Sequence, residues 1–476
     1  MKQILLRLAE YAAQDPARPA LKAVGQSLSY GELWQQIQAT AEQLRLWYPH
    51  AERPLALLGD NGLAWVITDL ACALAQRPCV PVPPFFNEQQ RQHLLQHSGC
   101  AGVLMLQQGQ LQHQPLPAVP GAPALPTGCV KITYTSGTTG TPKGVCLSGE
   151  QIDQTVLALA ERVGELGVTH HLCTLPLAVL LENLAGVYLP LSLGKQVSLL
   201  PLAELGLGSL QQPEPVRFIT ALAASGADSA ILLPATLSWL VAGVAQGGIS
   251  AQQWRLLALG GGKSSHALLT QADELGLPVF EGYGLSEVGS VAALNGPLAR
   301  RLGSVGRPLT HLQMKLAADG EVLIRGNAML GYLGEPLSST DEAWLATGDW
   351  GEFDADGFLF IQGRKKSTIV TGFGRNVAPE WLEAELAALP GVLQVFVYGD
   401  EALGLQALLF APGLQARGEA EQIITERNQN LPEYARLTEW RFIPLPFTAA
   451  SGELTANGRL RRDVIFAKHV LSEVLS

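Results

Sequence analysis

The 476-residue sequence predicts an α/β protein with two domains. The first is a large N-terminal domain of parallel or mixed sheets covered by helices, and the second is a small α+β domain. A chain of this length is too long for one hydrophobic core, and its 47% hydrophobic residues give ample material to bury. Short apolar runs alternate with helical patterns up to Gly363, where the composition changes, so we place the domains at residues 1–363 and 364–476.

The alternation is clearest in two stretches of the N-terminal part. Residues 54–58 form an apolar run typical of a strand, and a helical pattern from Leu63 to Ala75 follows it. Residues 230–233 and 235–245 repeat that order. Residues 107–127 are rich in Gln and Pro and have no apolar period, so we expect a surface connection there.

Beyond Gly363 the pattern is that of a compact α+β unit. We expect strands at 367–370, 392–398 and 405–410, and helices at 379–388 and 419–430.

No targeting or membrane-spanning segment is expected. The first ten residues begin an amphipathic helix whose apolar run is too short for a signal peptide. The most apolar region, residues 172–200, carries Glu182, Lys195 and two prolines, which argues against a transmembrane helix.

Charge and cysteine content narrow the class of partner. The formal net charge of −10 argues against broad binding to nucleic acid or to an anionic membrane, so small molecules are the expected partners. No cysteine pair has the spacing of a zinc site, and no disulfide framework is indicated, which fits a reducing cytoplasm. The six cysteines are Cys72, Cys79, Cys100, Cys129, Cys146 and Cys173.

The most informative segment is the loop at residues 134–145, which reads Tyr-Thr-Ser-Gly-Thr-Thr-Gly-Thr-Pro-Lys-Gly-Val and follows an apolar run typical of a strand. Its glycines let backbone N–H groups approach phosphate oxygens, its hydroxyls add donors, and Lys143 adds positive charge. It is not the P-loop of nucleoside triphosphatases, in which lysine directly follows a glycine, because Pro142 precedes Lys143. Composition alone leaves a flexible surface loop as the alternative.

This string resembles, almost letter for letter, the phosphate loop of the adenylate-forming superfamily, which includes acyl-CoA synthetases, firefly luciferase and the adenylation domains of peptide synthetases. The resemblance spans nearly the whole chain and is strongest to bacterial medium- or long-chain fatty acyl-CoA synthetases. It implies the adenylate-forming fold, with a small mobile C-terminal domain that rotates at a hinge near Lys366. It assigns the ATP phosphates to Lys143 and to Thr135, Ser136, Gly137, Thr138, Thr139 and Gly140.

Two further motifs complete the nucleotide site that the resemblance implies. Leu257 to Gly262 ends an apolar run in three glycines, and Gly261 and Gly262 would let adenine lie against bare backbone. Residues 281–288 read Glu-Gly-Tyr-Gly-Leu-Ser-Glu-Val and resemble the signature Y-G-x-T-E, with serine in place of threonine.

The resemblance gives each residue of this signature a role. Tyr283 would stack on adenine, with Gly284 beside it in the nucleotide site. Ser286 would contact the α-phosphate, and Glu287 would hold Mg²⁺, for which a carboxylate oxygen is a suitable ligand. For either motif taken alone, a tight turn or a strand end is the simpler interpretation.

The remaining carried-over positions lie around the domain boundary. In Thr347-Gly-Asp349 the aspartate would accept hydrogen bonds from both ribose hydroxyls, and Arg364 would also reach the ribose. Lys366 occupies the hinge position. Gly374 would line the channel for CoA or a phosphopantetheine thiol, although a loop entering the helix at Pro379 is the simpler interpretation.

The implied reaction has two steps. A carboxylate attacks the α-phosphorus of ATP to give acyl-AMP and pyrophosphate, and a thiol then displaces AMP. The family places a lysine in a C-terminal T-x-x-G-K motif for the first step, whereas this chain has Arg459 there. A guanidinium keeps the charge but not the shape. Three interpretations stay open: Arg459 supports adenylation in a modified geometry, adenylation is slow and thioester formation dominates, or the chain is a non-catalytic nucleotide- or acyl-binding relative.

The acid is expected to be a medium- or long-chain fatty acid. Peptide-synthetase adenylation domains generally present an aspartate to the amino group of their substrate, and the resemblance assigns no acidic residue of this chain to that role. Residues 175–191 align with a family stretch that lines the acyl pocket, and Val179 replaces its usual histidine. With Val288 and a helix placed at Ile231–Val241, an aliphatic pocket is expected, although most of these leucines fit an ordinary core equally well. CoA is the expected thiol, and an acyl carrier protein is the alternative acceptor.

Overall fold

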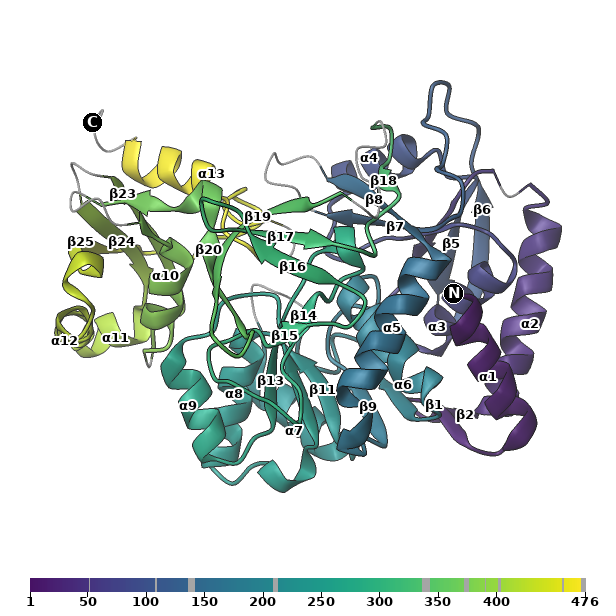
Figure 1. The fold of residues 1–476 in the computed structure, drawn as a ribbon, viewed down its shortest axis with the longest axis horizontal. Coiled ribbons are helices and arrows are strands. Elements are labelled where there is room, and N and C mark those ends of the chain that lie inside the picture. Colours follow the sequence, from purple (N-terminus) through teal and green to yellow (C-terminus); the bar gives the residue numbers. More distant parts are fainter. Residues whose placement is uncertain are drawn as a thin grey trace.

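The computed structural model describes residues 1–50, 52–107, 109–135, 142–208, 213–335, 343–371, 376–389, 391–400, 404–455 and 458–471. Figure 1 shows a large body, which contains the N-terminal half of the chain, and a smaller C-terminal unit at one end. No helix within the described ranges is both long and apolar enough to cross a bilayer.

The first large sheet has nine strands in the order β15-β14-β13-β12-β11-β9-β10-β1-β2. Its central pairs, from β10 to β13, are parallel, and β2, β14 and β15 pair antiparallel at its edges. The strands are β1 Pro19–Ala23, β2 Gln26–Ser29, β9 His170–Cys173, β10 Gln196–Leu199, β11 Ser229–Leu232, β12 Leu256–Leu259, β13 Val279–Tyr283, β14 Ala293–Leu294 and β15 Arg307–Pro308.

The second large sheet has seven strands in the order β18-β8-β7-β4-β3-β5-β6. Parallel pairs join β7, β4, β3 and β5, whereas β6, β8 and β18 are antiparallel to their neighbours. The strands are β3 Leu55–Leu58, β4 Cys79–Pro81, β5 Gly102–Gln107, β6 Gln110–Pro115, β7 Cys129–Thr135, β8 Lys143–Ser148 and β18 Gly331–Tyr332.

Helices fill the space between the two sheets and cover their outer faces. The largest core contains apolar side chains of α1, α2, α3 and α5 together with one face of each sheet. A second core joins α7, α8 and α9 to β11 and β12, and α4 covers the far face of the other sheet. The helices are α1 Lys2–Gln14, α2 Tyr30–Trp47, α3 Leu63–Leu74, α4 Glu88–Ser98, α5 Gly149–Val163, α6 Leu189–Ser192, α7 Pro215–Ser225, α8 Pro234–Ala245 and α9 His266–Glu274.

A four-stranded antiparallel sheet, in the order β16-β17-β19-β20, leads from the large body toward the C-terminal unit. Its bounds are β16 Gln313–Leu316, β17 Glu321–Arg325, β19 Leu345–Phe353 and β20 Leu359–Arg364. A short 3₁₀ turn, Lys365–Ser367, follows β20 directly.

The C-terminal unit has cores of its own, built from residues 369 and beyond. It contains a two-stranded sheet and the three-stranded sheet β23-β24-β25. Its elements are β21 Ile369–Val370, β22 Asn376–Val377, α10 Pro379–Ala387, β23 Gln394–Asp400, β24 Gly404–Phe410, α11 Pro412–Arg417, α12 Ala420–Gln429, β25 Leu437–Phe442 and α13 Arg462–Phe466.

The expected α/β class and the parallel strands are confirmed, and so are the helices near 63–75, 235–245, 379–388 and 419–430. The six cysteines are free and buried. The boundary at residues 363 and 364 stays a prediction, as does movement of the C-terminal unit.

Three expectations need correction. Residues 107–127 are not only a connection, because β6 pairs with β5 along its length. This edge strand is mostly solvated, so it needs no apolar period. Residues 134, 135 and 143–145 belong to the strands β7 and β8 rather than to a loop. The segment Ile231–Val241 is not one helix, because β11 ends at Leu232 and α8 begins at Pro234.

Candidate active site

The described residues of the predicted nucleotide site lie where several strands end. Tyr283 is the last residue of β13, and Gly261 and Gly262 follow the neighbouring parallel strand β12. Ligands of open α/β sheets bind outside the carboxyl ends of the strands, so this edge is the expected location. Asp349 and Arg364 reach it from the antiparallel sheet, where β19 and β20 pair these two residues.

The strands on either side of the predicted phosphate loop form a hairpin. Thr135 and Lys143 are opposite one another in the β7–β8 register, so the ends of the loop are held together. The Lys143 ammonium lies 2.8 Å from Glu335 Oε1 and 4.8 Å from the centre of the Tyr332 ring. Ser136, Gly137, Thr138, Thr139 and Gly140 lie outside the described residues.

The predicted ribose group is assembled around one carboxylate. The Tyr283 hydroxyl donates to Asp349 Oδ2 at 2.5 Å, and Arg364 Nε lies 2.9 Å from Asp349 Oδ1. Arg364 also donates to the Thr347 carbonyl at 2.9 Å. Asp349 is buried, and burial raises its pKa, whereas Arg364 and Tyr283 lower it. Each carboxylate oxygen has a second lone pair for a ligand hydroxyl.

Arg459 approaches this group from the C-terminal unit. Gly458 has a left-handed φ of 81°, and the Arg459 N–H donates to Thr455 Oγ1 at 2.9 Å, so the threonine and glycine of the motif build the turn that holds the arginine. Arg459 is exposed to solvent, yet the surrounding protein desolvates its guanidinium in part. This desolvation and the Arg364 guanidinium lower the pKa of Arg459, whereas Asp349 raises it. The guanidinium therefore lies within electrostatic reach of the predicted ribose carboxylate.

Glu287 lies in the 3₁₀ turn Ser286–Val288, which follows β13, and is partly exposed. Its Oε1 accepts a hydrogen bond of 2.8 Å from the Tyr332 hydroxyl. A carboxylate keeps further lone pairs on both oxygens, and Mg²⁺ prefers such oxygens. This residue therefore fits the magnesium ligand that the family implies.

The glycines of these motifs differ in what they require. A Cβ on Gly284 would lie 1.8 Å from the Ser290 carbonyl oxygen, so close backbone packing explains this glycine without a ligand. Gly261 has a left-handed φ of 79° and is exposed together with Gly262, which leaves bare backbone at the end of β12.

Lys366 is exposed in the short turn after β20. The ion pairs of this turn are made by its neighbour Lys365. Lys365 Nζ lies 2.5 Å from Asp319 and 3.0 Å from Glu321 Oε2. Glu321 Oε1 also accepts the Gly348 N–H at 2.8 Å. Glu321 therefore links Lys365, beside the predicted hinge residue, to the motif Thr347–Asp349 of the predicted ribose group. Gly374 lies outside the described residues.

The segment expected to line the acyl pocket is largely core. Leu175, Leu177 and Val288 are buried, as are Ile231 and Val241. Val179 is partly exposed.

Glu182, which the sequence offered only as an argument against a membrane span, is fully buried. It accepts the backbone N–H groups of Thr174 and Leu175 at 3.3 and 2.7 Å and lies 3.2 Å from His171 Nε2. These hydrogen bonds hold the backbone at the start of the segment at residues 175–179.

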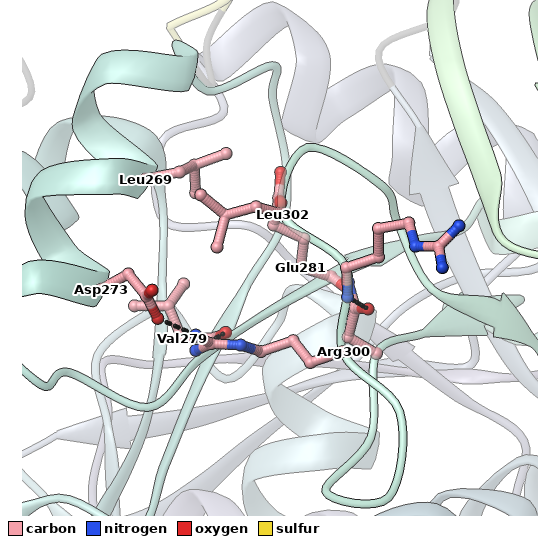
Figure 2. Close-up of a pocket in the computed structure, with 8 residues that line it drawn as sticks. Leu269, Asp273, Val279, Glu281, Arg300 and Leu302 are labelled. Atoms are coloured by element: carbon pink, nitrogen blue, oxygen red, sulfur yellow. Dashed lines mark hydrogen bonds and ion pairs between the residues drawn. The ribbon is translucent and has the colours of Figure 1, made fainter.

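A small hollow lies beside β13, and Figure 2 shows the residues that line it. They include Leu269, Asp273, Val279, Glu281, Arg300 and Leu302. Glu281 lies there and accepts the Gly303 N–H at 2.9 Å, and Asp273 pairs with Arg300 nearby. Burial raises the pKa of Glu281 to about 7. The described residues of the predicted nucleotide site do not line this hollow, so it is a separate feature.

Sequence reasoning missed Tyr332, Glu335 and Glu321. They lie outside the quoted motifs, and the signals in the sequence are weak: an aromatic residue after Gly331, and single acids in ordinary surface patterns. Their contacts arise from strands that are distant in the chain, such as the pairing of β18 with β8.

The model of the family described as AMP-binding enzyme matches residues 8–333. Long-chain-fatty-acid–CoA ligase FadD15 of Mycobacterium bovis is 33% identical over 221 residues, which cover 40% of this chain and only 37% of that ligase. The putative fatty-acid–CoA ligase fadD11 of Mycobacterium tuberculosis is 28% identical over 414 residues, covering 72% of each chain.

The fold is similar to that of solved structures over almost the full length. O-succinylbenzoate coenzyme A synthetase from Bacillus subtilis, solved in complex with AMP, superposes with a TM-score of 0.76 at 24% identity. The similarity covers 96% of this chain and 97% of that one, which confirms the expected fold.

Proposed function

Because this chain belongs to the AMP-binding enzyme family, we propose that it is an ATP-dependent acid–thiol ligase that activates a carboxylic acid as acyl-AMP and then forms a thioester with CoA. The observation that carries the proposal is that Tyr283 and Arg364 both contact the buried carboxylate of Asp349, with Arg459 within electrostatic reach of it. Three features thus lie near the carboxyl ends of parallel strands: carboxylate oxygens that can accept hydrogen bonds from a ribose, an aromatic ring, and cationic side chains.

In the first step, a substrate carboxylate oxygen bonds to the α-phosphorus of ATP, and the bond from that phosphorus to the bridging oxygen of pyrophosphate breaks. Asp349 and Arg364 orient the nucleotide through its ribose, and Arg459 and Lys143 stabilise negative charge on the phosphates. Glu287 would hold Mg²⁺, which supplies further neutralisation of the phosphate charge when bound.

In the second step, a thiolate sulfur bonds to the acyl carbon, and the bond from that carbon to the AMP oxygen breaks. The C-terminal unit would turn at Lys366 and replace Arg459 by the segment around Gly374. The contacts of Lys365 with Asp319 and Glu321 belong to the arrangement in which Arg459 lies within electrostatic reach of Asp349.

For the acid we propose a medium- or long-chain fatty acid, with CoA as the acceptor. The support is the sequence similarity to fatty-acid–CoA ligases together with the replacement of histidine by Val179, which makes the expected pocket wall more apolar. Each additional buried CH₂ then contributes about 0.8 kcal/mol, so affinity rises with chain length until the pocket is filled.

The test is carboxylate-dependent ATP–pyrophosphate exchange, with acids from acetate to palmitate, benzoate and mixed amino acids. Wild type is expected to exchange with aliphatic acids. Arg459→Ala is expected to lower exchange by at least about 100-fold through loss of charge stabilisation, with the neighbouring Arg461→Ala as the control. Thioester formation is then measured with CoA and with a holo acyl carrier protein.

Other outcomes identify the alternatives. Exchange by Arg459→Lys but not by wild type points to a chain that keeps the nucleotide site and has lost adenylation. Thioester formation with the carrier protein but not with CoA identifies the carrier protein as the acceptor. ATP binding without exchange for any acid or variant contradicts the proposed ligase.

A further inference from the structure

The segment at residues 329–335 connects the two groups that the proposed function assigns to the phosphate tail and its metal ion. The Met329 N–H donates to the Glu287 carbonyl at 2.7 Å, and the Leu333 N–H donates to the Gly144 carbonyl at 2.8 Å. Between these bonds, β18 pairs with β8, with Tyr332 opposite Val145. One short stretch of backbone is thus bonded both to the turn of Glu287 and to the strand of Lys143.

The Tyr332 side chain repeats this connection. Its hydroxyl donates to Glu287 Oε1 at 2.8 Å, and the Lys143 ammonium lies 4.8 Å from its ring centre. The phenol of Tyr332 therefore contacts both a carboxylate of the turn after β13 and a lysine of β8. Carboxylates that bind metal ions are commonly held by such a hydrogen bond from a neighbouring group.

Glu335 holds the lysine loosely. Its Oε1 lies 2.8 Å from Lys143 Nζ, but the two side chains are 48% and 46% exposed. An ion pair so exposed to water contributes little, so the phosphates of a nucleotide can replace Glu335 at small cost. The ring of Tyr332 stays in place during that exchange, because β18 anchors it.

We infer that Tyr332 is a positioning residue for the nucleotide phosphate tail: its hydroxyl orients the Glu287 carboxylate toward the metal ion, and its ring supports the Lys143 ammonium. This inference rests on the proposed function. The hydroxyl acts on Glu287 and the ring acts on Lys143, so substitutions of Tyr332 can separate the two effects. The hydroxyl acts on the metal-dependent part of ATP affinity, and the ring acts on the part that needs no metal.

The experiment measures ATP binding to the full-length chain by calorimetry, once in EDTA and once with excess MgCl₂. The ratio of the two Kd values is the metal-dependent gain. Tyr332→Phe is expected to reduce this gain by about tenfold, as for loss of other groups that orient metal ligands, and to leave the Kd in EDTA unchanged. Tyr332→Leu is expected to weaken binding in EDTA as well, by about 2- to 5-fold.

Two controls make the result specific. Tyr434→Phe removes the hydroxyl of an exposed tyrosine in the C-terminal unit and should change neither Kd. In a Glu287→Gln background, Tyr332→Phe should have no further effect on the gain, because the hydroxyl acts through that carboxylate.

A full metal-dependent gain in Tyr332→Phe overturns the inference and leaves the proposed function intact. An equal, additional loss in the Glu287→Gln background overturns it too, because the hydroxyl then acts elsewhere. Absence of ATP binding by wild type in both conditions overturns the proposed function, and this inference with it.

Discussion

At the scale of single residues, two acids differ in their partners: Asp349 of the predicted ribose group and Glu281 of the separate hollow at β13. Asp349 accepts a hydrogen bond from Tyr283 and pairs with Arg364, and these contacts oppose the rise in its pKa that burial causes. Glu281, two residues before Tyr283, receives one backbone hydrogen bond, and burial raises its pKa to about 7. Burial is the largest cause of the raised pKa of both acids, and at Asp349 the ion pair with Arg364 opposes it.

Glu281 is expected to make stability fall with rising pH. Its pKa is about 7 in the folded chain, against a reference value of 4.5, so the folded state holds its proton more tightly. The stabilisation is complete below pH 4.5 and is lost as pH rises through 7. Glu281→Gln cannot ionise, so its stability relative to wild type should rise by about 3 kcal/mol between pH 4.5 and 8. Urea denaturation across this range measures the difference.

A constant difference between Glu281→Gln and wild type across that range contradicts the raised pKa. Glu352→Gln is a suitable control, because that acid is exposed and lies in the neighbouring sheet.

At the scale of elements, the turn between β20 and β21 carries the predicted hinge. Lys366 is the middle residue of the 3₁₀ turn Lys365–Ser367, and Arg364 at the end of β20 still belongs to the ribose group. A change of backbone angles here can turn the C-terminal unit and leave the ribose group in place. The ion pairs of Lys365 bias the turn toward the arrangement seen here.

Lys366→Pro is expected to keep pyrophosphate release and to abolish thioester formation. Proline fixes φ near −65°, which a 3₁₀ turn tolerates but a rotating hinge does not. Lys366→Ala is the control and should retain both steps. Single-turnover measurements of acyl-AMP and thioester check this, and equal losses in the two steps would argue against a hinge at this position.

At the scale of the whole molecule, the C-terminal unit is held against the large body by polar contacts. Glu385 in α10 lies at the N-terminus of α9, where its carboxylate accepts the His266 N–H at 3.4 Å, and Arg427 of α12 pairs with the same carboxylate. Such contacts can break and form again, which suits a unit that the proposed reaction requires to move.

Arg427→Ala is expected to destabilise the folded chain by about 2 kcal/mol, because it leaves a buried carboxylate without its partner. The loss is smaller than for a fully buried pair, since the Arg427 side chain is 28% exposed. The double variant Glu385→Leu/Arg427→Ala should regain most of this stability. Chemical denaturation of the four members of this cycle measures the coupling, and additive losses would show that the pair is not coupled.

Local patterns made the α/β class and the motif positions predictable. Glycines, hydroxyls and a lysine between two strands indicate phosphate binding because the chemistry resides in neighbouring residues, and the β7–β8 hairpin keeps them together. Alternating apolar runs predicted the parallel strands for the same reason. The edge strand β6 was not predicted, because its backbone pairs with β5 while most of its side chains are exposed, so it shows no apolar period.

By itself the sequence determined the family and the fold class, and it predicted the residue types of a nucleotide site. Only the tertiary structure decided which of these residues meet: Asp349 contacts Tyr283 and Arg364, and Tyr332 contacts both Glu287 and Lys143. It also brought Arg459 of the C-terminal unit within electrostatic reach of Asp349. The physical reason is separation along the chain. Hydrogen bonds and ion pairs act over a few ångströms, and positions almost two hundred residues apart, such as Lys143 and Glu335, approach that closely only when β18 has paired with β8 in one sheet.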